Sequence, residues 1–325
     1  MAEMTPRSTS EPPVADDAAV FPGGRLGRLY ALTRRTPSKR TQRVLLGIAT
    51  VVFLVGGWFA FTSLDVTLDE IRWVPMVIAA VVGVPLTLVA NTFEYLLSAR
   101  LLHHRTRFLP ALQLTTMSTA ANLLPIPGAF LVRVQGLRAM GSRYGRALAS
   151  TAVVGLVWIG VSALMAAILL LVGQRWVAAA VLGAAGIPPL LGAHAWLRRA
   201  VPETGERRRL AGLLVAVELF AVFTNAGRLV LILIGLGVDA DVDQALVLAV
   251  SSSLAAAAGI LPGGFGLREL IAAALAPLVG LPASAGFAAT AINRVMGIVV
   301  LAPITAALAL GLGPRPKLEE EAEEG

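Results

Sequence analysis

Charged side chains inside long apolar stretches are the residues of this chain whose types could do chemistry. Arg133, Arg268 and Arg294 lie within or next to such stretches, and Glu269 follows Arg268 directly. A charge at the centre of a membrane helix costs roughly 2.5–3.5 kcal/mol on insertion scales, so an unpaired one is seldom incidental. Guanidinium groups bind phosphate and carboxylate through forked hydrogen bonds. We therefore predict that these arginines, with Glu269 beside them, bind an anionic group.

The composition places these charges in a membrane protein. Of the 325 residues, 56% are hydrophobic and 14% are charged, and there is no cysteine; the mean hydropathy is +0.76. Soluble domains are about half apolar and a quarter charged, so a soluble enzyme is not expected. The apolar content argues against a disordered chain, and the lack of cysteine argues against a disulfide-stapled secreted domain.

Six apolar stretches are long enough to cross a bilayer as helices, which takes about 20 residues. Two further apolar regions, 109–132 and 245–282, are interrupted in the middle by Pro and Gly. Backbone groups freed at such breaks survive at membrane depth only where protein buries them or where they line a watery cavity, so we predict two broken re-entrant hairpins. The six predicted spans are Val44–Leu64, Val74–Leu97, Ala147–Gly173, Val177–Leu197, Leu210–Gly237 and Ala285–Leu310.

Lys and Arg gather in alternate loops, and this asymmetry predicts the orientation of the spans. They lie before the first span, on both sides of the first hairpin, in the loop around 198–209 and after the last span. The other loops hold Asp and Glu, with only Arg72 and Arg175 as basic residues. We therefore expect both termini on the cytoplasmic side of the inner or plasma membrane. Because topology explains the basic residues, no nucleic-acid partner is predicted.

The two broken regions resemble each other. Pro127-Gly128-Ala129-Phe130 corresponds to Pro262-Gly263-Gly264-Phe265, and at the same separation Arg133 corresponds to Arg268. Each half has three crossings, so the second half must enter the membrane inverted, as in many transporters. We thus predict an all-α polytopic membrane protein with six spanning helices plus two re-entrant broken hairpins, arranged as an inverted-topology repeat. Its predicted segments are a disordered basic tail (1–43), a first membrane repeat (44–173), a second inverted membrane repeat (174–310) and an acidic tail (311–325).

The repeat also relates two other charged residues. Glu94 and Arg228 occupy nearly equivalent positions in the two halves, which predicts an ion pair between them across the pseudo-twofold axis. For Glu94 and Glu218, a purely structural role in holding the bundle together is left open. The substrate site is expected where the broken helices meet near the midplane. Its remaining predicted residues are Asn122, Pro127, Gly128, Pro262, Gly263 and Gly264.

Signals for other kinds of chemistry are absent or incomplete. The three histidines have no metal-ligand spacing. The Asp239–Asp243 run lacks the Gly and the closing Glu that a calcium loop needs. No Walker loop is present, and Gly264-Phe265-Gly266 does not complete a dinucleotide fingerprint. We therefore predict no catalytic residue, no metal and no cofactor.

The motif around the second break resembles that of a known family. Pro262-Gly263-Gly264-Phe265-Gly266-Leu267-Arg268-Glu269 is similar to the P-G-G-x-G-x-x-E signature of the flippase-like family that includes the membrane region of lysylphosphatidylglycerol synthase. Asn122-Leu123-Leu124-Pro125 with Gly128 and Arg133 looks like that family's earlier N-x-x-P…G…R motif. Arg294 fits the arginine of the family's last span. The resemblance covers nearly all of the chain after about residue 44.

The resemblance implies movement of lipids or lipid-linked glycans between leaflets. In the synthase the aminoacyl-transferring domain is a separate soluble region, so lysyl-lipid synthesis by this chain alone is not expected. The predicted function is a lipid flippase that translocates the head group of an anionic phospholipid or lipid-linked glycan, with membrane lipids as partners. Two alternatives stay open: a membrane-bound enzyme or accessory acting on a lipid-linked sugar, and a secondary transporter of a small anion. A second copy of the chain or a separate lipid-synthesising enzyme is an open further partner.

Overall fold

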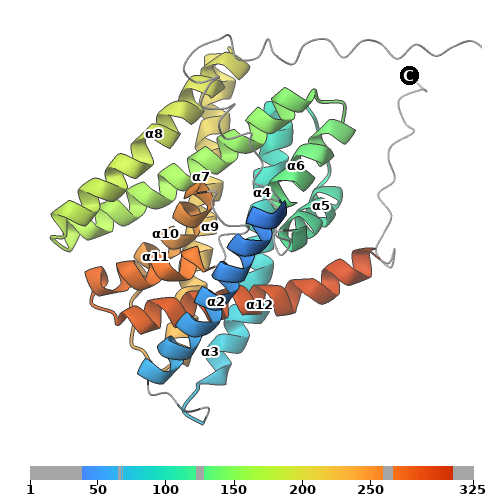
Figure 1. Cartoon of the computed structure of the whole chain (residues 1–325). Coiled ribbons are helices and arrows are strands. Elements are labelled where there is room, and N and C mark those ends of the chain that lie inside the picture. The colour runs from blue at the N-terminus through green and yellow to red at the C-terminus, as the bar shows by residue number, and fades with distance from the viewer. Residues whose placement is uncertain (1–38, 65–66, 68, 122–127, 259–265, 310–325) are drawn as a thin grey trace, which may run out of the picture. The chain divides into compact units, whose positions relative to one another are not determined.

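The computed structural model describes residues 39–64, 67, 69–121, 128–258 and 266–309, and every element in these ranges is helical (Figure 1). The acidic tail (311–325) and all but the last five residues of the basic tail (1–43) lie outside the described residues. Those last five residues are helical: the first described helix, α2 (Lys39–Leu64), begins five residues before the predicted start at Val44. Of the predicted site residues, Asn122, Pro127, Pro262, Gly263 and Gly264 also lie outside the described ranges.

Five helical stretches of the described chain are long and apolar enough to cross a membrane, so the chain is an all-α integral membrane protein. Each overlaps one of the predicted spans, with ends that differ by a few residues. The remaining predicted span, Val44–Leu64, lies within the 26-residue helix α2, of which Thr50–Leu64 is apolar among the residues whose side chains are described. The five stretches are Trp73–Leu101, Tyr144–Val172 (α7), Trp176–Ala200 (α8), Thr204–Gly235 (α9) and Ala283–Ala307, the last within α12 (Ala283–Ala309).

The first of these stretches contains a wide turn. It consists of α3 (Trp73–Ile78), a π-helical turn η2 (Ala79–Gly83) and α4 (Val84–Leu101). Pro85, near the start of α4, has no backbone N–H with which to continue the α-helical pattern of the preceding turn. Turns of this kind are frequent at functional sites.

Shorter helices lie in the two regions where re-entrant hairpins are predicted. In the first region α5 (Phe108–Ala121) packs against α6 (Gly128–Ala139), and in the second α10 (Val242–Ala258) packs against α11 (Leu267–Leu275). A short 3-10 helix, η4 (Ala276–Val279), follows α11. Helix α5 also contacts α12, and α10 contacts α7. Each short pair is therefore packed against a long helix of the other half of the chain.

Small residues bring the long helices together. Helices α7 and α8 lie side by side (Figure 1), and Gly160 of α7 faces Gly186 of α8 so closely that an added Cβ would lie 3.0 Å from the Gly186 carbonyl oxygen. At the other end of the chain, the Phe287 ring of α12 fills the space beside Gly56 of α2. Small residues allow close backbone approach, which drives helix association in lipid.

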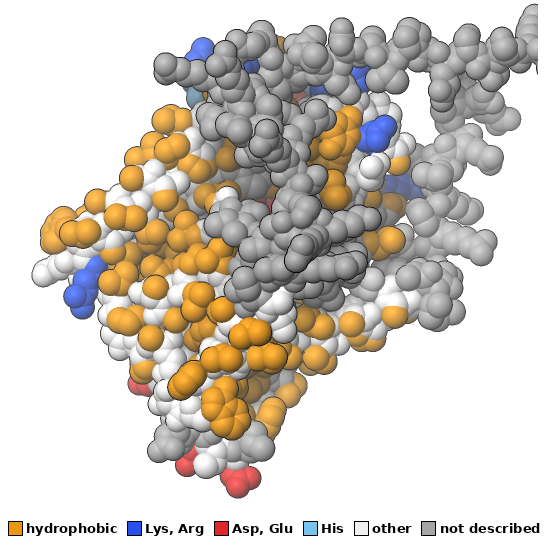
Figure 2. All heavy atoms as spheres, viewed as in Figure 1, with side chains coloured by type: hydrophobic (Ala, Val, Ile, Leu, Met, Phe, Trp, Pro, Cys, Tyr) orange, Lys and Arg blue, Asp and Glu red, His pale blue; other side chains and the backbone are white. Residues whose placement is uncertain are grey.

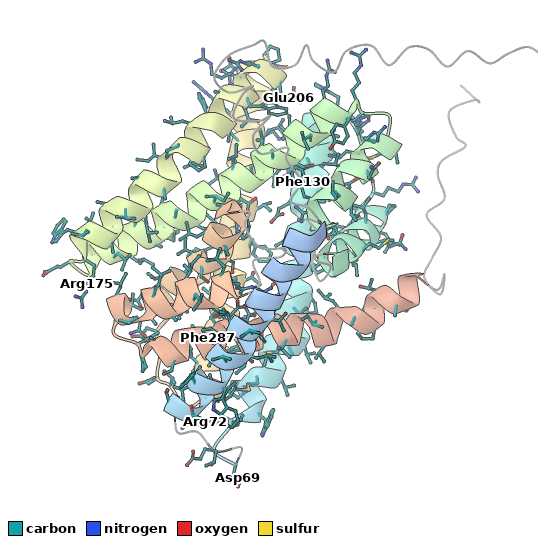
Figure 3. All side chains as sticks on the ribbon, viewed as in Figure 1. Asp69, Arg72, Phe130, Arg175, Glu206 and Phe287 are labelled. Carbon is teal, nitrogen blue, oxygen red and sulfur yellow. The ribbon has the colours of Figure 1, made fainter. Side chains whose placement is uncertain are left out.

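The described surface matches a lipid environment. Val172, Val177 and Trp58 are 79%, 80% and 71% exposed, and Figure 2 shows apolar side chains over most of the described face in that view. In the same view Lys and Arg gather at the upper end, where Glu206 also lies, and Asp and Glu gather at the lower end, near Asp69 (Figure 3). Soluble monomers rarely expose contiguous apolar patches larger than a few hundred Å².

Candidate functional site

Buried polar residues occur at two levels along the contact between α4 and α9. Thr87 of α4 lies beside Arg228 of α9, and Glu94 of α4 lies within electrostatic range of Glu218 of α9. Residue numbers rise along one helix as they fall along the other, so α4 and α9 run antiparallel. Because a helix rises 1.5 Å per residue, Glu218 and Arg228 are separated by about 15 Å along α9. We call Glu94, Arg133 and Glu218 the first polar cluster, and Arg228, Arg268, Glu269, Asn293 and Arg294 the second polar cluster.

In the first polar cluster one arginine lies among two carboxyl groups. Arg133 of α6 donates from Nη1 to Oε2 of Glu94 at 2.8 Å, and the two side chains are 16% and 11% exposed. Glu218 is 0% exposed, and neither of its carboxyl oxygens has a hydrogen-bond partner among the described residues. The charges of Glu94 and Arg133 both reach Glu218. The ion pair therefore lies within electrostatic range of a carboxyl group that has no hydrogen-bond partner among the described residues.

The predicted ion pair between Glu94 and Arg228 is wrong. Arg228 donates from Nη1 to Thr87 Oγ1 at 3.2 Å and from Nη2 to the Asn293 carbonyl oxygen at 3.0 Å. Glu94 lies two helical turns further along α4 than Thr87, which places it about 10 Å away along the axis. Glu94 and Arg228 therefore lie at different levels along the contact between α4 and α9, and Glu94 pairs with Arg133 instead.

The second polar cluster joins α9, α11 and α12. Arg294 of α12 donates from Nε to Oε1 of Glu269 at 2.8 Å, and the Glu269 side chain is wholly buried. Arg268, the neighbour of Glu269 on α11, lies within electrostatic range of Arg294 and Arg228. Asn293 donates from Nδ2 to Asn225 Oδ1 at 3.0 Å, which connects α12 to α9. Of the predicted arginines, Arg268 and Arg294 therefore lie together with Arg228, while Arg133 belongs to the first polar cluster.

The second polar cluster has more positive than negative charge among the described residues. Glu269 compensates Arg294, but Arg228 donates only to a hydroxyl and a carbonyl oxygen. Arg268 makes no ion pair in the described part of the chain, and its Nε atom is buried without a hydrogen-bond partner. A buried charge without a counter-charge is unfavourable by several kcal/mol. The cluster is therefore electrostatically suited to an anion.

The π-helical turn makes room for Arg228. The side chain is 6% exposed, and its Cγ and Cδ atoms lie against Gly83, where an added Cβ would overlap them. Thr87, which accepts from Arg228, donates in turn to the Gly83 carbonyl oxygen at 2.9 Å. Gly83 and Thr87 were not predicted as site residues. The only sequence signal for them is a glycine two positions before Pro85 within an apolar stretch.

Two further residues of the first motif, Phe130 and Gly128, are described by the structure. Phe130, at the position after Ala129 in the first motif, packs in an apolar cluster with Tyr95 and Leu137 rather than among the charged residues (Figure 3). Gly128, predicted at the substrate site, is the first residue of α6, five positions before Arg133. Across the described ranges, no group of three or more acidic or histidine side chains is arranged to hold a metal ion.

Comparisons with known proteins leave the family open. No protein-family model matches the chain, and no curated protein matches it either. The resemblance of Pro262–Glu269 to the flippase-like motif therefore stays a prediction from the sequence. What the fold and the site define is a class: an all-α membrane protein with two polar clusters that both include a residue of α9.

Proposed function

We propose that this protein is a lipid flippase whose second polar cluster binds the anionic head group of its substrate. The observation that carries the proposal is the pair Arg228 and Arg268, two guanidinium groups within the helical bundle that have no carboxylate partner among the described residues. A bound phosphate would supply the missing negative charge and accept forked hydrogen bonds from both.

The position of Arg268 in its helix strengthens this site. Arg268 lies in the first turn of α11, a helix of nine residues. Free N–H groups and the positive end of the helix dipole favour anions at such a place. Glu269 in the same turn is held by Arg294, so the salt bridge fixes the orientation of α11 against α12. Glu269 and Arg294 therefore position the arginine that meets the ligand.

The level of the second polar cluster suggests where the head group enters. Arg228 is seven residues from Gly235, the end of α9, which corresponds to about 10 Å. The basic residues that precede Leu210 lie at the opposite end of the same helix. If the Lys- and Arg-rich loops are cytoplasmic, the second polar cluster lies nearer the outer leaflet. Acyl tails would stay against the apolar outer surface while the head group passes through the bundle.

The contacts of the short helices support alternating access by two related halves. Helix α5 contacts α12 and α10 contacts α7, which is the reciprocal pattern that a twofold repeat would produce. Transporters built from inverted repeats move one half against the other around a site at their interface. We include this repeat, with its two re-entrant hairpins, in the proposal.

A leaflet-sidedness assay on proteoliposomes tests the function. Fluorescent analogues of phosphatidylglycerol, an aminoacyl lipid, a polyprenyl phosphate and zwitterionic phosphatidylcholine are reconstituted with the full chain, and outward-facing label is quenched. We expect protein-dependent access to the inner pool for an anionic lipid but not for phosphatidylcholine. Arg268→Met should abolish that access, whereas Arg175→Met, at an exposed position beside α8 (Figure 3), should preserve it.

Three results would overturn the proposal in different ways. Equal movement of anionic lipids by wild type and Arg268→Met would remove the site. Saturable uptake of phosphate or a carboxylate without lipid movement would favour a small-anion transporter. Product formation from a lipid-linked sugar by the purified protein would favour a membrane enzyme.

A further inference from the structure

Glu218 is a buried acid for which the proposed head-group site has no use. It lies inside the span formed by α9, is 0% exposed and has no hydrogen-bond partner on either carboxyl oxygen among the described residues. An ionised carboxylate in such surroundings is far less favourable than the neutral acid. The antiparallel register of α4 and α9, set by the contact of Thr87 with Arg228, brings Glu94 to within about one helical turn of the level of Glu218.

The charged groups that face Glu218 come from two helices. They are Glu94 of α4 and Arg133 of α6, joined by their salt bridge. Tyr95, next to Glu94, adds a buried phenol within electrostatic range of Arg133. On α12, Arg294 is paired with Glu269. The charged residues of the other helices packed against α9 lie near the ends of those helices: Arg146 on α7, Arg198 and Arg199 on α8, and Asp243 on α10.

We propose that Glu218 is a proton-binding site and that Arg133 exchanges its carboxylate partner when the proton moves. In the described arrangement Glu218 carries the proton and Arg133 pairs with Glu94. In the exchanged arrangement the O–H bond of Glu218 breaks, the proton passes to Glu94, and Arg133 pairs with the new carboxylate of Glu218. Each arrangement holds one cation, one carboxylate and one neutral acid, so the charge of the first polar cluster stays the same.

Access to water decides how the proton leaves. The Glu94 side chain is 11% exposed and that of Arg133 is 16% exposed, whereas Glu218 has no exposed surface. Glu94 is therefore the group through which the cluster takes up and releases protons.

This exchange would connect proton binding to the second polar cluster through α9. The helix carries both Glu218 and Arg228, and Arg133 lies on α6, the second helix of the first short pair. Movement of Arg133 between its partners shifts α6 relative to α4 and α9, which supplies a proton-driven step for transport. This coupling rests on the proposed function, but the proton site itself does not.

Infrared difference spectroscopy on the full chain in lipid tests the proton site without a transport substrate. Wild type at neutral pH should show the carbonyl band of a buried, protonated carboxyl group. Glu218→Gln should lose that band, whereas Glu206→Gln, at an exposed position on the same helix (Figure 3), should retain it. Glu94→Gln should also lose the band although Glu218 is present, because Arg133 then pairs with Glu218 and ionises it.

The outcomes separate this proposal from the proposed function. A band that persists in Glu218→Gln overturns the proton site, and a band that persists in Glu94→Gln overturns the exchange of partners. Thermal unfolding in detergent confirms that each variant is folded, and the glutamine in Glu218→Gln has nearly the shape of the protonated acid. If both variants lose the band but the wild-type protein moves no lipid, the flippase proposal is contradicted and the proton site is not.

Discussion

The two polar clusters both include a residue of α9, Glu218 in the first and Arg228 in the second, but they differ in their balance of charge. In the first, Arg133 lies among Glu94 and Glu218, so one proton is enough to make the group neutral. The second combines three arginines, Arg228, Arg268 and Arg294, with one acidic residue, Glu269. Helix α9 therefore contributes to one site suited to a proton and to another suited to an anion.

One residue accounts for most of this difference. In the sequence repeat, Arg133 corresponds to Arg268, and Glu94 corresponds closely to Arg228. The first half combines an acid with a base at these positions, and the second half combines two bases. In the proposed repeat, this change of sign at one position would give the two halves different ligand preferences.

Glu269→Gln should give the largest effect on stability. The variant leaves Arg294 without its carboxylate beside two further cations, and breaking a buried pair in this way costs about 3–5 kcal/mol. Glu94→Gln should cost much less, because Arg133 still has Glu218 as a partner. Thermal unfolding in detergent measures both. Equal losses in the two variants would show that the clusters do not differ in charge balance.

Gly83→Ala should disturb the second polar cluster alone. The added Cβ overlaps Cγ and Cδ of Arg228, and overpacking of this kind costs about 1–3 kcal/mol. Gly227→Ala is the matched control, since nothing lies within 4 Å of a Cβ at that position. We expect thermal unfolding to separate the two variants. A Gly83→Ala protein as stable as the control would mean that the π-helical turn does not confine Arg228.

Arg268→Met should raise the thermal stability of the ligand-free protein. Removing a partly buried cation that has no carboxylate partner relieves repulsion from Arg228 and Arg294, a gain of about 1 kcal/mol. Arg133→Met should instead lower stability, because Glu94 then loses its partner. The comparison uses thermal unfolding in lipid-free detergent. A destabilised Arg268→Met would indicate that this arginine has a counter-charge in the protein.

Asn225→Ala should have the smallest effect. It removes the hydrogen bond from Asn293 that connects α9 to α12, and such bonds between membrane helices contribute about 0.6 kcal/mol on average. Thermal unfolding, with Gly227→Ala again as the reference, measures the difference. A loss as large as that of Glu269→Gln would show that this hydrogen bond, and not the charges, holds the second polar cluster together.

The long helices could be predicted because each requires only a continuous apolar run. The predicted span Ala147–Gly173 and the observed α7, Tyr144–Val172, differ by at most three residues at either end. Part of the second polar cluster could also be predicted, since Arg268 and Glu269 are adjacent and Arg294 lies in an otherwise apolar helix. These are local features of the sequence.

Features that depend on packing could not be predicted. The partner of Glu94 is decided by which face of α6 meets α4, and no sequence pattern shows that face. The apolar sequence carries no signal for the π-helical turn at Ala79–Gly83 other than Gly83 and the following Pro85. The two clusters lie at different levels because of the antiparallel register of α4 and α9. An alignment of the two halves of the sequence does not show this register.

The most direct measurement is the thermal stabilisation that phosphatidylglycerol gives to the purified protein, titrated against phosphatidylcholine. A ligand at 100 times its dissociation constant stabilises the folded state by about 2.7 kcal/mol. We predict that the anionic lipid stabilises wild type and Glu94→Gln to the same degree and does not stabilise Arg268→Met. Stabilisation that survives Arg268→Met and disappears in Glu94→Gln would contradict the assignment of the anion to the second polar cluster.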